Sequence, residues 1–136
     1  MISDYDKGTV DYGLLQHLRD HFSGAIFVDT KKTDLARIEG CIVKINRSER
    51  ERVQSLCTDL VVTLGAEGAW YQDQHFAAKA IEIVDMCGAG DTFLAALCYR
   101  YLGCQDMPQA IGFALRASAV TVQHPGVYAP ALEEIT

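Results

Sequence analysis

The sequence lacks the features that identify several other classes of protein. It contains no signal peptide and no apolar segment of about 18 residues, so we expect neither export nor a membrane anchor. Positive charge is not in excess, since the net charge is -6, and this argues against a nucleic-acid-binding surface. Internal repeats and low-complexity linkers are also missing. The 136 residues, 49% hydrophobic and 22% charged, are instead typical of one soluble globular domain.

Cysteine and histidine patterns typical of metal or disulfide sites are missing too. The five cysteines form no CxxC pair and have no histidine nearby in zinc-ligand spacing. We therefore expect reduced thiols and a cytoplasmic protein. The histidines have no evident partners and are expected at the surface: His17, His21, His75 and His124.

Hydrophobic spacing predicts alternating strands and helices. Helical periodicity and continuous apolar runs are the two signals used. In chain order they predict a helix over 11–22, a strand over 25–29, a helical turn around 35–38, strands over 41–45, 60–64 and 69–71, one or two strands over 75–85, and helices over 93–102 and about 108–124. This order indicates a three-layer α/β fold with a mostly parallel sheet and helices on both faces. Ligands of such folds bind at the carboxyl ends of the strands.

The stretch Asp85-Met86-Cys87-Gly88-Ala89-Gly90-Asp91-Thr92 carries the clearest chemical signal. Its glycines allow a tight turn that brings N–H groups to a helix start, where unpaired amides and the helix dipole favour a phosphate. A carboxylate there would repel the phosphate unless it accepts a proton from an attacking hydroxyl, which suggests this task for Asp91. Alternatively, Gly88 and Gly90 only cap the junction, and Asp91 is an N-cap or a first-turn acid.

This stretch resembles the Asp-Thr-x-Gly-Ala-Gly-Asp signature of the ribokinase-like, PfkB-type carbohydrate kinases. Asp85 and Gly88 to Asp91 match, whereas Met86 stands where the family usually has Thr or a small aliphatic residue. The departure affects the packing beneath the loop and leaves the anion hole and the base intact. The resemblance implies that Asp91 is the catalytic base and that the amides of Gly88, Ala89 and Gly90 form the anion hole.

An Asn-x-x-Glu pattern, Asn46-Arg47-Ser48-Glu49, follows the expected strand over 41–45. As local structure, Asn46 or Ser48 caps a helix over 49–56, and Glu49 complements the helix dipole. The kinase family places this pattern after the same strand. The resemblance implies that Asn46 and Glu49 hold water around Mg²⁺, which retains much of its hydration shell.

A glycine turn follows the strand over 60–64. Thr63, Gly65 and Gly68 match a Thr-Leu-Gly-x-x-Gly segment that lies beside the nucleotide in the family. The resemblance therefore assigns these three residues to the nucleotide side of the site. The alternative is that the glycines serve only to allow positive φ.

The beginning of the chain resembles the heptose 7-phosphate kinases of ADP-heptose synthases. Ser3-Asp4-Tyr5 and Lys7-Gly8 match their Ser-Asp-Tyr-x-Lys-Gly stretch, which ends a strand near the sugar. Lys7 would then reach a substrate phosphate, or else Asp6-Lys7-Gly8 is an ordinary polar turn. Lys31-Lys32 is a second basic spot of a kind that binds phosphates.

The resemblance implies a single partial kinase domain over 1–136, the C-terminal, nucleotide-binding half of the ribokinase-like fold. The expected function is Mg²⁺-assisted phosphorylation of a sugar or sugar phosphate by ATP, with heptose 7-phosphate as the first candidate. The alternative is a non-catalytic nucleotide-binding or assembly module, truncated from or pairing with a complete sugar kinase. An open sheet edge also predicts that something covers it: a second copy of this chain, a separately encoded N-terminal half, or the rest of a longer parent protein. Neither nucleic acid nor a membrane is expected as a partner.

Overall fold

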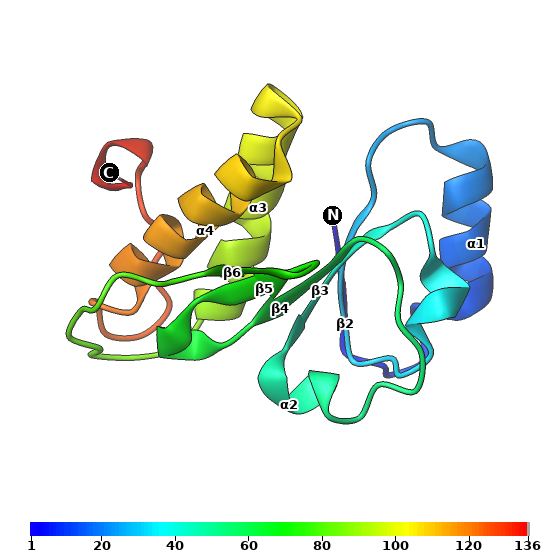
Figure 1. Ribbon diagram of the computed structural model, residues 1–136, viewed down its shortest axis with the longest axis horizontal. Coiled ribbons are helices and arrows are strands. Elements are labelled where there is room, and N and C mark those ends of the chain that lie inside the picture. The colour runs from blue at the N-terminus through cyan, green and yellow to red at the C-terminus, as the bar shows by residue number, and fades with distance from the viewer. Residues whose placement is uncertain (136) are drawn as a thin grey trace. The chain divides into compact units, whose positions relative to one another are not determined.

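The computed structural model describes residues 1–135, which form two compact units (Figure 1). Unit 1 comprises residues 1–65 and 70–75, and unit 2 comprises residues 66–69 and the chain from 76 onward. Unit 1 contains, in chain order, β1 (Ile2–Asp4), α1 (Tyr12–His21), β2 (Phe27–Thr30), the 3-10 helix η1 (Leu35–Ile38), β3 (Ile42–Asn46), α2 (Arg47–Arg50) and β4 (Leu60–Thr63). Unit 2 contains α3 (Ala89–Cys104), α4 (Met107–Thr121) and the 3-10 helix η3 (Leu132–Glu134). The 3-10 helix η2 (Gly65–Glu67), β5 (Ala69–Tyr71) and β6 (Gln74–Phe76) contribute residues to both units.

Unit 1 is built on parallel strands. β1 pairs with β2, β2 with β3 and β3 with β4, and the hydrogen-bonded order of the sheet runs from β1 to β6. The register places Asp4 opposite Thr30 and Asn46 opposite Thr63. Because the strands are parallel, these four residues lie at the same edge of the sheet, where the strands end.

The core of unit 1 lies between this sheet and the helical segments α1 and η1. α1 starts at its N-cap Asp11, whose carboxylate accepts a hydrogen bond from the Leu14 amide, and it buries Leu15 completely. Burying such a side chain contributes about 1.5–3 kcal/mol. The buried core cluster comprises Leu15, Ile26, Val28, Leu35, Ile38, Cys41, Val43, Ile45, Cys57 and Leu60.

Unit 2 is a helical hairpin of α3 and α4. Asp106 caps α4 by accepting a hydrogen bond from the Gln109 amide, and Pro108 occupies the first turn, where its missing N–H costs nothing. The two helices are in contact with each other, and both carry buried apolar side chains, namely Phe93, Leu94, Ala96, Leu97, Met107, Ala110, Ile111, Ala114 and Ala117.

The prediction of one or two strands over 75–85 is confirmed only at its start, by β6, and is wrong for the residues that lead into the glycine motif. β6 ends at Phe76, and residues 77–88 contain no strand. The amides of Val84 and Asp85 both donate to the Val122 carbonyl oxygen, at 2.8 and 3.1 Å. The end of α4 thus takes the hydrogen bonds that a neighbouring strand would otherwise supply.

The helix expectations need three further corrections. α3 begins at Ala89 rather than at Phe93, and it continues through Gly103, so that Gln105, with φ +53°, ends it instead. The helix expected over 49–56 is a single turn, α2, capped by Asn46 and not by Ser48. α4 ends at Thr121, three residues before the expected end at His124.

His17, His21 and His75 are exposed, as expected, and His124 is half-buried, but each of the four contacts another ring. His17 stacks on His21 along α1, and the ring of His75 lies 5.1 Å from that of Trp70. The ring of His124 stacks on Tyr128 with centroids 3.7 Å apart.

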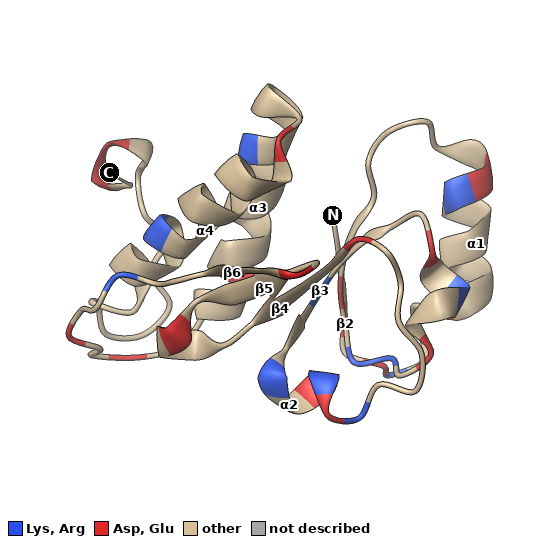
Figure 2. Ribbon diagram, viewed as in Figure 1, with Lys and Arg blue, Asp and Glu red and all other residues tan. Residues whose placement is uncertain are grey.

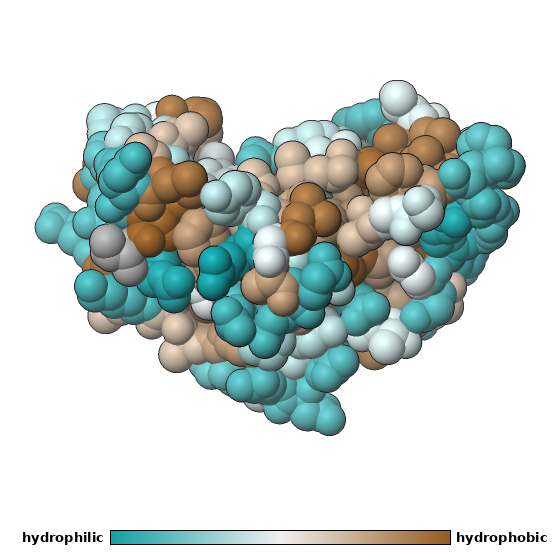
Figure 3. All heavy atoms as spheres, turned by 90° about the horizontal axis from the view of Figure 1, so that it is seen from above, coloured by the Kyte–Doolittle hydropathy of each residue, from teal (hydrophilic) through white to brown (hydrophobic). Residues whose placement is uncertain are grey.

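Apolar side chains also reach the surface, as the face in Figure 3 shows. On α3 the side chains of Tyr99 and Leu102 are each 58% exposed. Within residues 1–135, no helix combines the length and apolar character needed to cross a membrane.

Candidate active site

The glycine motif forms the N-terminal turn of α3 in unit 2. Gly88 is the N-cap, with φ +77° in the left-handed region, where a glycine is favoured. A Cβ at this position would also lie 3.3 Å from the side chain of Val127, which makes glycine doubly suitable. The Ala89 amide donates to the Met86 carbonyl oxygen at 3.3 Å, whereas those of Gly88 and Gly90 donate to no acceptor among the described residues. Two of the three expected anion-hole donors are therefore unpaired.

Asp91 lies in the same first turn of α3. Its side chain is exposed and makes no hydrogen bond or ion pair with any residue in 1–135. The turn thus combines free amide donors with a free acceptor within four consecutive residues.

Asp85 links the glycine turn to the loop after α4. Its carboxylate accepts hydrogen bonds from the amides of Cys87 and Gly126, both at 2.9 Å. These backbone hydrogen bonds lower the pKa of Asp85, because they stabilise the ionised form. The sequence analysis noted Asp85 only as a match to the motif and missed this role, which depends on a residue distant in the sequence.

The Asn-x-x-Glu pattern forms a capping box at the start of α2 in unit 1. The Asn46 side chain accepts from the Glu49 amide at 2.9 Å, and the Glu49 carboxylate accepts from the Asn46 amide at 2.7 Å. Thr63 lies beside Asn46 in the register and donates its hydroxyl to the Ile45 carbonyl oxygen at 3.3 Å. The structure therefore brings Asn46, Glu49 and Thr63 together at the ends of β3 and β4.

The capping box determines which oxygens of Asn46 and Glu49 remain free to bind Mg²⁺ or its water. The Asn46 side-chain oxygen and one Glu49 oxygen are engaged in the cap, which leaves the second Glu49 oxygen as an acceptor on a side chain that is only 8% exposed. No group of three or more His, Cys, Asp or Glu residues within 1–135 is arranged to hold a metal. One carboxylate oxygen fits an ion that keeps its water shell, so the donor set suits Mg²⁺ bound through water. Figure 2 shows basic and acidic residues alternating along α2 and the turn after it.

The glycine turn after β4 contains two residues with positive φ. Gly65 has φ +62° in unit 1, and Gly68 has φ +104° in unit 2. A Cβ on Gly68 would lie 1.9 Å from the Phe76 carbonyl oxygen, so only glycine fits there. No such contact faces Gly65, where the space around a Cβ is open. The positive φ angle thus favours a glycine at both positions, and close packing requires one at Gly68.

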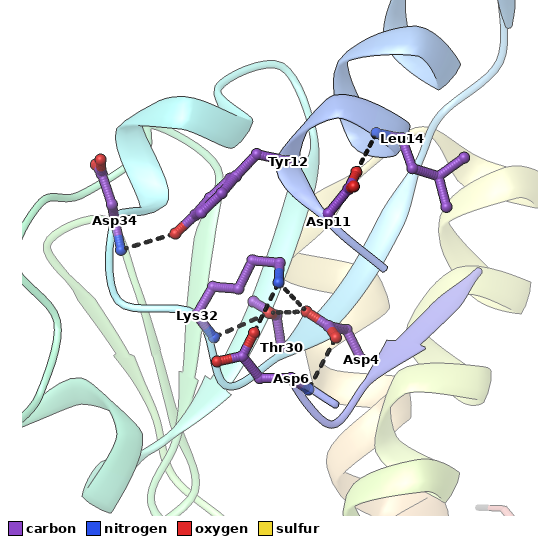
Figure 4. Close-up of polar contacts among 8 residues, drawn as sticks. All are labelled: Asp4, Asp6, Asp11, Tyr12, Leu14, Thr30, Lys32 and Asp34. Atoms are coloured by element: carbon purple, nitrogen blue, oxygen red, sulfur yellow. Dashed lines mark hydrogen bonds and ion pairs between the residues drawn. The ribbon is translucent and has the colours of Figure 1, made fainter. Parts of the chain in front are cut away.

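Lys7 lies on the exposed turn after β1. Lys32, by contrast, is unexpectedly buried (Figure 4). The Lys32 ammonium contacts the carboxylates of Asp4 and Asp6. Burial lowers the pKa of Lys32, but its hydrogen bonds and charge interactions with Asp6 and Asp4 raise the pKa more, so the net shift is upward. Lys31 remains exposed, with its ammonium 4.8 Å from the Tyr5 ring centroid. Of the basic pair, only Lys31 is accessible to a ligand.

A second buried lysine also escaped the sequence analysis. Lys44 in β3 pairs with Asp29 in β2 at 2.7 Å, and its side chain is 6% exposed. The only signal for it was a lysine inside an otherwise apolar run. Its partner became evident only from the register of β2 and β3.

The expected site residues are therefore divided between the two units. Unit 1 holds Lys7, Asn46, Glu49, Thr63 and Gly65, while unit 2 holds Gly68 and the turn from Gly88 to Asp91.

Comparisons with known sequences identify the family. Residues 37–135 match the model of the pfkB family carbohydrate kinases. The bifunctional protein HldE of Nitratiruptor is 30% identical over 159 residues, covering 99% of this chain and 34% of the relative. A ribokinase of Staphylococcus aureus is 39% identical over 83 residues, covering 56% of this chain and 27% of the relative. The chain thus spans about a third of the length of these relatives.

Solved structures share the fold. The ribokinase of Thermotoga maritima matches 98% of this chain and 54% of its own length, with a TM-score of 0.75 and 18% identity. A ribokinase of Arabidopsis thaliana, solved with ribose and ATP, matches 91% of this chain and 50% of its own length, again with a TM-score of 0.75 and 18% identity. These matches confirm the expected ribokinase-like fold. Together with the sequence match over 37–135, they show that this chain belongs to the pfkB family of carbohydrate kinases.

Proposed function

We propose that this chain is the nucleotide-binding part of an ATP-dependent kinase that phosphorylates a sugar or a sugar phosphate. The observation that carries the proposal is the first turn of α3, where the unpaired amides of Gly88 and Gly90 adjoin the exposed carboxylate of Asp91. Amides at a helix N-terminus bind phosphate oxygens, and a nearby free carboxylate accepts a proton. A kinase that transfers phosphate to an alcohol requires both.

In the proposed reaction Asp91 takes the proton of the sugar hydroxyl while the hydroxyl oxygen forms a bond to the γ-phosphorus of ATP. The bond from this phosphorus to the bridging oxygen breaks, and its electron pair leaves with ADP. Gly88, Ala89 and Gly90 form the anion hole, in which the Ala89 amide exchanges its long bond to Met86 for the phosphate. Positioning and charge stabilisation supply most of the rate enhancement in such reactions.

The remaining roles follow from the family. Asn46 and Glu49 would act together on the water shell of Mg²⁺: the second Glu49 oxygen would accept from that water, while Asn46 would hold Glu49 in place through the capping box. Mg²⁺ neutralises phosphate charge when it is bound. Thr63, Gly65 and Gly68 contact the nucleotide side of the site. For the substrate we propose heptose 7-phosphate, because the Ser3–Gly8 stretch has the pattern of that branch and HldE relatives match 99% of this chain. Lys7 would bind the substrate phosphate.

The test is phosphoryl transfer from ATP to heptose 7-phosphate, mannose 6-phosphate and ribose, comparing the wild type with Asp91→Asn. Loss of a general base lowers the rate by about 10²–10⁴-fold, while ATP binding persists. Asp106→Asn is the matched control, because asparagine caps α4 as well as aspartate does. The 136-residue chain alone is expected to bind ATP weakly with little turnover, so a longer protein that contains it is tested in parallel. Activity that survives Asp91→Asn in the active form would remove the proposed base.

A second candidate is a nucleotide-binding or assembly module without catalytic activity. The observation behind it is that the alignment with the HldE relative from Nitratiruptor covers only 34% of that protein's length. The two candidates differ in one measurement, since the module binds ATP but transfers no phosphate to any sugar of the panel in any form of the protein.

A further inference from the structure

Lys32, Asp4 and Asp6 form a cluster of charged side chains at the carboxyl ends of β1 and β2 in unit 1, and the first two are buried (Figure 4). The Lys32 ammonium lies 2.8 Å from Asp6 Oδ1 and 3.3 Å from Asp4 Oδ2. Thr30 donates its hydroxyl to Asp4 Oδ2 at 2.7 Å and accepts a hydrogen bond from the Lys32 amide at 3.0 Å. The register brings these groups together, because Asp4 and Thr30 are directly opposite each other in the sheet.

The two carboxylates of this cluster are not equivalent. The Asp4 side chain is 2% exposed, whereas that of Asp6 is 53% exposed. A buried carboxylate needs a compensating charge, and Lys32 supplies it for Asp4. Asp6 needs no such compensation, because water solvates half of its side chain. The bond between Lys32 and Asp6 therefore serves mainly to fix the segment that carries Asp6.

That segment is a turn with an unusual backbone. Asp6 has φ +55°, and Gly8 has φ +92°. A residue with a Cβ adopts the left-handed region at a cost, so contacts must hold Asp6 there. Two contacts do so: its amide donates to Asp4 Oδ1 at 2.9 Å, and its carboxylate accepts from the Lys32 ammonium.

Lys7 lies between these two residues of positive φ, so the direction of its side chain depends on the turn. Its own ammonium makes no hydrogen bond or ion pair with the described residues, 1–135. A cation on a fixed backbone binds an anion with less ordering cost than one on a mobile loop. The pairing of Asp6 with Lys32 also offsets the repulsion that the Asp6 carboxylate would exert on a phosphate beside it.

We propose that Asp6 is a positioning residue for phosphate recognition, whose ion pair with Lys32 holds the turn so that Lys7 meets the phosphate group of a sugar phosphate. This inference rests on the proposed function, which supplies the sugar phosphate. It assigns Lys32 to holding the turn and not to contacting the ligand. Lys7 alone then makes the direct contact with the phosphate.

The test uses the longer protein that contains this chain and compares its affinity for heptose 7-phosphate with that for the unphosphorylated heptose, by isothermal titration calorimetry. The ratio of the two dissociation constants measures phosphate recognition separately from sugar binding. Asp6→Asn removes the charge but keeps a side chain that tolerates the left-handed region. We expect Asp6→Asn and Lys7→Met each to reduce the ratio about tenfold, the loss typical of a charge-assisted hydrogen bond. The double variant Asp6→Asn/Lys7→Met should lose no more than Lys7→Met alone.

Asp11→Asn is the matched control, because it makes the same change at the N-cap of α1, where asparagine is equally effective. A ratio unchanged in Asp6→Asn, or effects of Asp6→Asn and Lys7→Met that multiply, overturns the inference. A wild type that does not prefer the phosphorylated heptose also overturns it. If Lys7→Met leaves the ratio unchanged, both the assignment of Lys7 and the inference about Asp6 are wrong. The role of Asp91 is tested separately, because phosphoryl transfer from ATP to ribose does not depend on Lys7.

Discussion

Unit 1 and unit 2 hold their candidate functional carboxylates in different ways. In unit 1 the Glu49 carboxylate is 8% exposed and forms half of the capping box of α2. In unit 2 the Asp91 carboxylate is exposed and makes no hydrogen bond with the described residues. The first group stabilises its own surroundings, whereas the second is free to act on a ligand.

We therefore expect substitutions of the candidate carboxylates to affect stability in unit 1 and the reaction in unit 2. Substitutions at the buried charges of unit 1 should change the free energy of unfolding as well as any ligand affinity. A substitution at Asp91 should change the reaction and leave stability within about ±0.5 kcal/mol, as is usual for exposed positions without structural contacts. The three predictions that follow test this contrast.

The largest effect is expected at Lys32. Lys32→Met leaves Asp4 as a buried carboxylate without a counter-charge, because the Asp4 side chain is 2% exposed and its ion pair is lost. Breaking a buried ion pair from one side typically costs about 3–5 kcal/mol. Chemical denaturation monitored by circular dichroism measures the change.

Lys31→Met provides the control. Lys31 precedes Lys32 in the sequence, but its ammonium is exposed and lies over the Tyr5 ring. It should change the free energy of unfolding by less than about 1 kcal/mol, the usual size of an exposed cation–π contact. Equal effects at Lys31 and Lys32 would contradict the contrast between buried and exposed charge.

An intermediate effect is expected at Asn46. Asn46→Ala removes the side chain that accepts the Glu49 amide, so it should lower the free energy of unfolding by about 0.5–2 kcal/mol. Asn46→Asp retains the cap and should lower the free energy of unfolding much less. Comparing the two variants therefore measures the structural role of Asn46 apart from any role toward Mg²⁺. The measurement is denaturation without nucleotide or metal. An unstable Asn46→Asp together with a stable Asn46→Ala would show that the cap is not what Asn46 contributes.

Local signals in the sequence were sufficient for much of unit 1. The helix α1 was predicted within one residue at each end, because Asp11 caps it and its leucines recur with helical spacing. The strands β2 to β4 were found because their apolar runs are buried on both faces. The kinase family was recognised from the motif around Asp91, and the sequence and fold comparisons confirm it.

Long-range contacts explain what was missed. The β-branched residues before the motif were expected to form a strand, but the amides of Val84 and Asp85 donate to Val122, far along the chain. The start of α3 was placed too late because Gly90 is a poor helix former, yet Ser118 of α4 donates to the Ala89 carbonyl oxygen at 3.1 Å and supports that first turn. The burial of Lys32 could not be predicted either, since its partner Asp4 lies in β1, which is distant from Lys32 in the sequence.

The smallest effect is expected from Asp85, the carboxylate of unit 2 that does have a structural role. Hydrogen bonds from the amides of Cys87 and Gly126 hold its pKa below the ordinary value of 3.8. A carboxyl group with a lowered pKa in the folded state contributes stability that is complete above the unfolded value and is lost as pH falls through the folded value. The stability of the wild type should therefore decline as pH falls below 3.8, and Asp85→Asn should lose the part of this decline that Asp85 causes. Thermal denaturation of the wild type and of Asp85→Asn between neutral pH and about pH 2 measures the difference. If the two proteins lost stability equally over this range, the hydrogen bonds from Cys87 and Gly126 would not couple Asp85 to the stability of unit 2.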